Sequence, residues 1–145
     1  MSEPVIKVAR SGVVASQVFR DAPDGDLFIA EGLGAIPFDI KRVYFINALA
    51  NPNAVRGKHA HRRLEQVIFC VNGSFKLCLD DGEKTQGIQL SAPTYGVRLG
   101  PMLWHTMTEF SPDCVIAVVA SDHFDAADYI REYELFRAEV AQSRP

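Results

Sequence analysis

The chain lacks the features that mark membrane proteins and nucleic-acid-binding proteins. No uninterrupted apolar run approaches the ~20 residues of a membrane span, and the N-terminal "MSEPVIKVARSG" has no apolar core of a secretion signal. The 15 basic residues are outnumbered by 18 acidic ones, so the net charge of -3 provides no bulk positive field for a polyphosphate backbone. We therefore expect a cytoplasmic protein that binds neither a membrane nor nucleic acid.

Cysteine is also scarce. Cys70, Cys78 and Cys114 lie in apolar runs without CxxC spacing and are odd in number, which disfavours a disulfide framework and predicts buried thiols. The remaining composition, 48% hydrophobic and 23% charged, is that of an ordinary globular protein. Because 145 residues is the usual size of one folded unit, we expect a single domain over residues 1–145.

Short strand patterns dominate what is present. Two turn sequences, Asn72-Gly73 and Asp81-Gly82, suit the type I′ turns that join antiparallel strands. No helical pattern separates the strands, which favours an all-β sandwich or jelly roll over a parallel βαβ sheet. The predicted strands are rich in β-branched or aromatic residues and span 41–47, 65–71, 74–80, 84–90, 95–100 and 114–121.

Only the C-terminal segment has a helical pattern. Asp125 and Asp128 suit an N-cap and a first helical turn. The sequence therefore predicts one C-terminal α-helix that packs on the β-structure or on a partner subunit. Its apolar face has a period near 3.6 and comprises Tyr129, Tyr133, Phe136 and Val140.

The segment "RGKHAHRRLEQ" concentrates the residues that could carry chemistry. His59 and His61 are two apart, so on a strand they share a face with backbones roughly 6.6 Å apart and can share one ligand. Glu65 has the same parity and would join them if the strand continued. A further histidine, His105, follows in "MLWHTM".

Three hypotheses compete for these histidines. With Glu65 and His105 they have the form of a three-histidine, one-carboxylate cupin site, which could hold Fe, Mn, Ni or Zn. Alternatively, two neutral imidazoles with an ordinary pKa of ~6.5 could take and return protons. The third hypothesis is that they are surface or core-edge histidines with no chemical role.

The surrounding motifs resemble one enzyme family. The segments "IPFDIKRVYFI", "RGKHAHRRLEQV", "VNGSFKLCLDDG", "GPMLWHTM" and "ASDHFDAADYIREYELF" look like those of cupin-fold nucleotide-sugar 3,4-ketoisomerases over about residues 25–137. That family converts dTDP-4-keto-6-deoxyglucose to the 3-keto sugar before a transaminase acts. The resemblance implies an all-β cupin jelly roll, working as a homodimer without a metal or redox cofactor in dTDP-3-amino-deoxysugar biosynthesis.

The resemblance also implies roles for individual residues. His59 and His61 would be the active-site pair. Because the C3 hydrogen is α to the C4 carbonyl, our own hypothesis is that His61 by preference carries the proton from C3 to C4 through an enediolate, while His59 hydrogen-bonds an enediolate oxygen or moves the proton between the oxygens; the reverse assignment is open. Arg56 would contact the diphosphate of the dTDP-linked keto sugar. The same cavity would contain Tyr44, Gln66 and His105.

Some positions keep other functions open. Family members often have Arg-Gly where this chain has Asp24-Gly25, which affects a substrate contact or the product's stereochemistry. Lys41 and Arg42 alternate along a strand, so at most one faces the cavity, and Tyr44 has the parity of Arg42.

The alternatives to the ketoisomerase function are a dTDP-sugar 3,5-epimerase, a metal-dependent cupin oxygenase, and a non-catalytic sugar-binding cupin.

Overall fold

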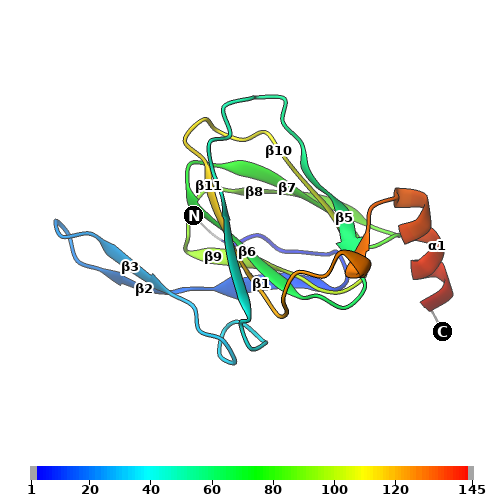
Figure 1. Cartoon of the computed structure of the whole chain (residues 1–145). Helices are drawn as coiled ribbons and strands as arrows, with labels where there is room; N and C mark the ends of the chain where they lie inside the picture. The colour runs from blue at the N-terminus through cyan, green and yellow to red at the C-terminus, as the bar shows by residue number, and fades with distance from the viewer. Residues whose placement is uncertain (1–2, 144–145) are drawn as a thin grey trace.

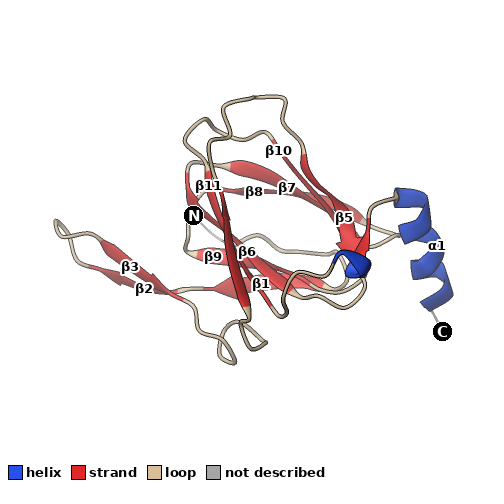
Figure 2. Cartoon of the chain, viewed as in Figure 1, coloured by secondary structure: helices blue, strands red, loops and turns tan. Residues whose placement is uncertain are grey.

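The computed structural model describes residues 3–143 and is built almost entirely of strands (Figure 2). A 3-10 helix, η1 (Ala126–Asp128), and an α-helix, α1 (Tyr133–Ser143), lie near the C-terminus. The strands are β1 (Ser11–Ala15), β2 (Gln17–Arg20), β3 (Asp26–Ile29), β4 (Arg42–Ile46), β5 (Arg56–His61), β6 (Gln66–Asn72), β7 (Phe75–Asp80), β8 (Thr85–Leu90), β9 (Tyr95–Leu99), β10 (Trp104–Thr108), β11 (Val115–Ala120) and β12 (Tyr129–Ile130).

Two five-stranded antiparallel sheets enclose the core (Figure 1). The first sheet has the strand order β1-β9-β6-β11-β4, and the second has β12-β5-β10-β7-β8. The remaining pair, β2 and β3, forms a hairpin that projects from the barrel in Figure 1. All six predicted strands are present, and the predicted all-β jelly roll with one C-terminal helix is confirmed.

The two predicted turns have different outcomes. Asp81-Gly82 joins the antiparallel pair β7 and β8, as predicted. The prediction is wrong for Asn72-Gly73, because β6 lies in the first sheet and β7 in the second, so this turn carries the chain between sheets. In both turns only the glycine has a positive φ, at 69° for Gly73 and 93° for Gly82, so neither is a type I′ turn.

The C-terminal helix begins later than the sequence predicts. Asp125 accepts a hydrogen bond from the amide of Ala127, but it caps the short η1 and not α1. The chain then extends through β12 before α1 begins at Tyr133. The predicted burial of Phe136 and Val140 is confirmed, and both pack on Ala60 and Ile130 outside the second sheet. Backbone pairing with β5 therefore overrides the helical period at Tyr129.

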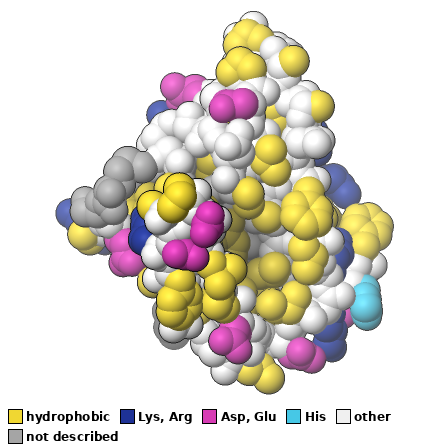
Figure 3. All heavy atoms as spheres, turned by 90° about the vertical axis from the view of Figure 1, so that its left-hand side faces the viewer, with side chains coloured by type: hydrophobic (Ala, Val, Ile, Leu, Met, Phe, Trp, Pro, Cys, Tyr) yellow, Lys and Arg dark blue, Asp and Glu magenta, His cyan; other side chains and the backbone are white. Residues whose placement is uncertain are grey.

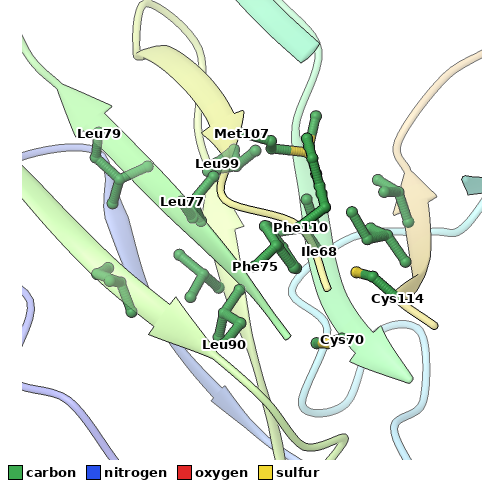
Figure 4. Close-up of a cluster of buried hydrophobic side chains, with 14 of the residues drawn as sticks. Ile68, Cys70, Phe75, Leu77, Leu79, Leu90, Leu99, Met107, Phe110 and Cys114 are labelled. Carbon is green, nitrogen blue, oxygen red and sulfur yellow. The ribbon is translucent and has the colours of Figure 1, made fainter. Parts of the chain in front are cut away.

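The main core lies between the two sheets and includes Phe75, Leu77, Leu90 and Phe110, whose side chains are labelled in Figure 4. Two of the three cysteines, Cys70 and Cys114, are buried as predicted, whereas Cys78 is half-buried on the outside of β7. Over residues 3–143, no helix is long and apolar enough to cross a membrane.

Candidate active site

A β-bulge in β5 brings its histidines to β10. His59 is paired with His105, whereas Gly57 is paired with Thr106, so Lys58 is the extra residue of the bulge. Gly57 and Lys58 have positive φ values of 83° and 56°. A Cβ atom at Gly57 would lie 3.0 Å from the carbonyl oxygen of His105. Glycine at this position therefore permits both the backbone conformation and the close approach of the two strands.

The three inward-facing histidines form one cluster. The ring centroids of His59 and His61 are 4.9 Å apart and those of His59 and His105 are 4.7 Å apart, both in edge-to-face arrangements. The structure thus brings His59 and His61 together as the strand spacing predicts, and it adds His105 from a different strand.

Tyr129 completes the cluster and is a residue that the sequence analysis placed incorrectly. It belongs to β12, where it pairs with His61, and not to the predicted helix. Its ring centroid is 4.3 Å from that of His61 and 4.9 Å from that of His59. The apolar period of the segment fits Tyr129 as well as Tyr133, so the local pattern could not separate a strand residue from a helix residue.

The first sheet contributes the opposite wall. Gln66 is buried and donates a hydrogen bond of 2.7 Å to the hydroxyl of Tyr44. Burial raises the pKa of Tyr44 to about 12, so its phenol stays protonated. Arg42 lies over the Tyr44 ring at 5.4 Å, while Lys41 is exposed, as the alternation of strand residues predicts.

These side chains surround a cavity of about 250 Å³. Among the six predicted residues, Arg56, Tyr44, His59 and His105 line it directly. A second cavity of about 60 Å³ adjoins it, and His61 lines that one. Gln66 lines neither cavity but contacts the hydroxyl of Tyr44. The lining of the larger cavity comprises Arg42, Tyr44, Ile46, Arg56, Gly57, His59, His105, Met107 and Tyr129.

The larger cavity favours an anion. Its lining has the guanidinium groups of Arg42 and Arg56 and no carboxylate. A further guanidinium, that of Arg131, lies 4.4 Å from the centroid of the Tyr129 ring. Arg131 is not predictable as a site residue from the local pattern, because "YIRE" fits the helical period of the C-terminal segment.

The histidines of the cluster are held in the neutral form. Burial lowers the pKa of His59, and the charge of Arg131 lowers it further against a hydrogen bond to Gly57. Burial lowers the pKa of His61 to about 4, with the neighbouring His59 acting in the same direction and Asp128 opposing. Burial places the pKa of His105 well below its usual value. At neutral pH all three imidazoles can therefore accept a proton.

The tautomer of His59 follows from its hydrogen bond. Its Nδ1 lies 3.0 Å from the carbonyl oxygen of Gly57. A carbonyl oxygen only accepts, so Nδ1 carries the proton of the neutral ring, and Nε2 is left as the basic atom.

Glu65 does not join the histidines, contrary to the parity argument. β5 ends at His61, and the chain bends before β6, which breaks the alternation. The Glu65 carboxylate instead accepts hydrogen bonds from Nε of Arg98 at 3.0 Å and from its Nη2. Within residues 3–143, no three or more His, Cys, Asp or Glu side chains are grouped so that they could hold a metal ion.

Asp24 and Gly25 lie in the turn between β2 and β3. In Figure 1 this hairpin is on the opposite side of the barrel from β12 and α1. Neither Asp24 nor any other residue of this hairpin lines the cavity within one chain.

Known proteins with similar sequences and structures include sugar 3,4-ketoisomerases. The chain is 48% identical to the TDP-4-oxo-6-deoxy-alpha-D-glucose-3,4-oxoisomerase of Aneurinibacillus thermoaerophilus over 118 residues, which cover 81% of this chain and 84% of that protein. The crystal structure of the sugar 3,4-ketoisomerase QdtA from Thermoanaerobacterium thermosaccharolyticum with TDP has 36% identity and a TM-score of 0.88, covering 92% and 96% of the two chains.

A histidine-to-asparagine variant of QdtA in complex with TDP-4-keto-6-deoxyglucose has 35% identity and a TM-score of 0.90, covering 94% and 97% of the chains. The similarity extends over the barrel and confirms the predicted cupin-type fold. Residues 12–141 match the family described as "FdtA: WxcM-like, C-terminal". The chain therefore belongs to the FdtA family of WxcM-like C-terminal proteins.

Proposed function

We propose that the protein is a 3,4-ketoisomerase that converts dTDP-4-keto-6-deoxyglucose to the dTDP-3-keto-6-deoxyhexose. The observation that carries this proposal is the cluster of neutral histidines beside an arginine-lined cavity, in a chain similar to enzymes of that activity. The product has a ketone at C3, which is the group that an amino-transfer reaction needs. We also propose that the chain is a single cupin domain, that it is cytoplasmic, and that it acts in dTDP-3-amino-deoxysugar synthesis.

The reaction requires two proton transfers and no change in overall oxidation state. The hydrogen on C3 is α to the C4 carbonyl, so a base can remove it to form an enediolate. The base, whose proton can exchange with solvent, then delivers a proton to C4, while the proton of the C3 hydroxyl moves to the oxygen on C4. The C3–H and O3–H bonds break and the C4–H and O4–H bonds form, which balances the isomerisation.

We assign the carbon-to-carbon transfer to His59. His59 lines the cavity, and its Nε2 is the free basic atom because Nδ1–H donates a hydrogen bond to the carbonyl oxygen of Gly57. The sequence favoured His61 for this step, but His61 is 4% exposed and lines only the smaller cavity. We assign His61 to the transfer between the two oxygens.

Isotope exchange separates the two assignments. In deuterium oxide, His59→Asn should lose both turnover and deuterium incorporation at C3. His61→Asn should still exchange the C3 hydrogen but turn over slowly, because the oxygen-to-oxygen transfer is impaired. NMR of the sugar after incubation measures both, and the opposite pattern would reverse the assignment.

The arginines suit the diphosphate. A guanidinium group is permanently charged and binds two phosphate oxygens at once. Arg56 is exposed at the cavity, where it can meet the nucleotide part of the substrate, and Tyr44, Gln66 and His105 would shape the sugar end.

The same labelling experiment tests the function as a whole. With the unaltered protein and dTDP-4-keto-6-deoxyglucose in deuterium oxide, we expect a 3-ketone with deuterium at C4. Deuterium at C5 would instead show a 3,5-epimerase, and absence of any exchange would favour a sugar-binding module. Stoichiometric iron together with chelator-sensitive activity would show a cupin oxygenase.

We further propose that the working form is a homodimer. The outer face of the first sheet exposes Val43, Phe45 and Val71, at 52%, 69% and 47%. The projecting hairpin exposes Phe19 and Leu27, at 49% and 56%. Figure 3, which views the molecule from the side on which the hairpin projects, shows hydrophobic side chains at the surface. A two-stranded hairpin is only marginally stable alone, so we expect these apolar surfaces to be buried against a partner. A second copy of the chain carries the same two surfaces and can bury both.

Light scattering after gel filtration tests the dimer. We expect twice the chain mass for the unaltered protein and a single chain mass for Phe45→Glu, which places a charge on the exposed face. Gln89→Glu, on the exposed side of β8, is the matched control and should remain dimeric. A monomeric unaltered protein would contradict this part of the proposal.

A further inference from the structure

Asp128, the last residue of η1, holds its carboxylate against His61. Its Oδ2 lies 3.4 Å from Nδ1 of His61, and the two side chains are only 8% and 4% exposed. The Arg63 guanidinium is 3.8 Å from Oδ1, but that side chain is 71% exposed. His61 is thus the buried ionisable partner of Asp128. The predicted helix gave Asp128 no such role, since there it was only an acidic residue of the first turn.

Backbone amides keep this carboxylate in place. The amide of Arg63 donates to Oδ1 at 2.8 Å, and the amide of Leu64 donates to Oδ2 at 3.1 Å. The amide of Arg62 donates to the carbonyl oxygen of Asp128 at 2.9 Å. The loop after β5 and the end of η1 are therefore locked together, and the carboxylate cannot rotate without breaking a buried hydrogen bond.

The carboxylate determines which nitrogen of His61 carries the proton. An ionised carboxylate only accepts, so it favours the tautomer with the proton on Nδ1 and a free lone pair on Nε2. No protein group among residues 3–143 makes a good hydrogen bond to either nitrogen. At 3.4 Å the contact with Asp128 is long, and such contacts tighten when the substrate binds and the imidazole gains charge.

We infer that Asp128 is the positioning residue of His61, fixing the Nδ1–H tautomer so that Nε2 can accept the hydroxyl proton of the enediol. The inference rests on the proposed ketoisomerase function. It adds a buried carboxylate that acts through His61 and does not touch the substrate. His61 has His59 and Tyr129 at its ring edges and Arg42 on β4. Within residues 3–143, Asp122, Asp125 and Asp128 all line the small cavity beside His61, but only Asp128 is buried and contacts the imidazole.

The change Asp128→Asn should reverse the tautomer. An asparagine has one oxygen to replace two, and the amide of Arg63 makes the shorter of the two backbone hydrogen bonds. The asparagine oxygen should therefore face Arg63, which turns its NH₂ group toward His61. That group donates to Nδ1 and forces the proton of the neutral ring onto Nε2, where the lone pair is needed.

Nitrogen NMR of ¹⁵N-labelled histidines measures the tautomer without substrate. The His61 signals are assigned by their loss in His61→Asn. We expect Nδ1–H in the unaltered protein and Nε2–H in Asp128→Asn. Kinetics should show a kcat reduced by about 100-fold or more with KM within about threefold, the size expected for a lost proton transfer.

Asp125→Asn is the matched control. Asp125 also forms an ion pair with Arg63 and caps η1, a role that asparagine can fill, but it is exposed. This variant should keep both the tautomer and the activity of the unaltered protein.

The outcomes separate the inference from the function. Nε2–H at His61 in the unaltered protein would overturn the inference even if Asp128→Asn failed to fold. Normal kcat or an unchanged tautomer in a folded Asp128→Asn protein would also overturn it. An unaltered protein without ketoisomerase activity would instead overturn the proposed function, and the NMR result would still decide the tautomer.

Discussion

The two ends of the barrel interior are built from the same strands but differ in chemistry. On β10, His105 and Met107 both face inward, yet the first meets His59 and the second belongs to the apolar core. On β6, Gln66 contacts Tyr44, whereas Ile68, two residues later, is part of that core. On these two strands, one inward-facing position therefore separates the apolar end from the polar end. Met107 lies at the boundary, because it also lines the cavity, and Leu79 and Leu99 extend the core beside His105 and Gln66.

The difference shows how the fold divides stability from chemistry. Phe75, Leu77 and Leu90 are fully buried at the apolar end, and each such side chain contributes about 1.5–3 kcal/mol. At the polar end, burial costs solvation of the imidazoles and lowers their pKa values. Burial at the apolar end thus offsets the free energy that burying the imidazoles costs. Variants at the apolar end should therefore change the free energy of unfolding, and variants at the polar end should change the activity.

The largest effect should come from His59→Asn. Removing the carbon base should reduce kcat by about 10²- to 10⁴-fold, because general acid-base catalysis contributes that much. TDP affinity and the unfolding midpoint should change little, since Asn is polar and similar in size. Calorimetry with TDP and an NMR assay measure these quantities. His123→Asn, at an exposed histidine, is the control. Equal activity of His59→Asn and His123→Asn would contradict the assignment of the carbon base to His59.

The opposite pattern should follow from Leu77→Ala. The side chain is 0% exposed in the main core, so its truncation should lower the free energy of unfolding by about 2–5 kcal/mol. Activity of the folded protein should stay near normal at low temperature, because Leu77 does not line the cavity. Urea unfolding and the same NMR assay would check this. A large loss of kcat without a loss of stability would contradict the division between the two ends.

Acid should destabilise the protein through the polar end. The folded pKa of His61 is about 4, below the unfolded value of about 6.5, so between these values the unfolded chain binds protons that the folded chain does not. Stability should therefore fall as pH decreases, by about 2 kcal/mol from His61 alone between pH 7.5 and pH 5. The groups facing His61 are His59, Tyr129, Asp128 and Arg42.

Urea unfolding at both pH values measures this loss. In His61→Asn the drop in stability on acidification should be smaller by about 2 kcal/mol, while Leu77→Ala should keep the full drop. An identical pH dependence in His61→Asn and the unaltered protein would show that His61 is not held neutral by burial.

The smallest effect should come from Arg56→Ala. Arg56 is exposed at the cavity and would hold the diphosphate from the solvent side, so TDP affinity should fall by about tenfold. Stability and kcat at saturating substrate should be close to normal. Calorimetric titration measures the affinity, with Lys41→Ala as a control at an exposed cation immediately before β4 that does not line the cavity. Unchanged TDP affinity in Arg56→Ala would contradict the proposed contact between Arg56 and the diphosphate.

Much of the fold could be predicted because strand patterns are local. The six predicted strands are present, and the alternation in β4 correctly placed Arg42 and Tyr44 on one face with Lys41 on the other. Asn72-Gly73 misled the prediction because a sharp turn does not tell whether the next strand pairs with the last one or crosses to another sheet.

The candidate site was predictable only in part. The spacing of His59 and His61 and the family motifs identified the centre of the site. Its further members, Tyr129, Arg131 and Asp128, were hidden in a segment with a helical period, since nothing local signals that β12 pairs with β5. Glu65 was misplaced because the bend after His61 ends the alternation.

The sequence by itself determined six of the strands, the presence of a C-terminal helix, the proximity of His59 and His61, and the family resemblance. These depend on side chains a few residues apart, whose spacing is set by the backbone period. Only the tertiary structure decided that Glu65 pairs with Arg98, that His105 and Tyr129 meet the pair, and that Asp128 lies against His61. Those contacts depend on the register and bulges of strands far apart in the chain, which are selected by the packing of the whole barrel.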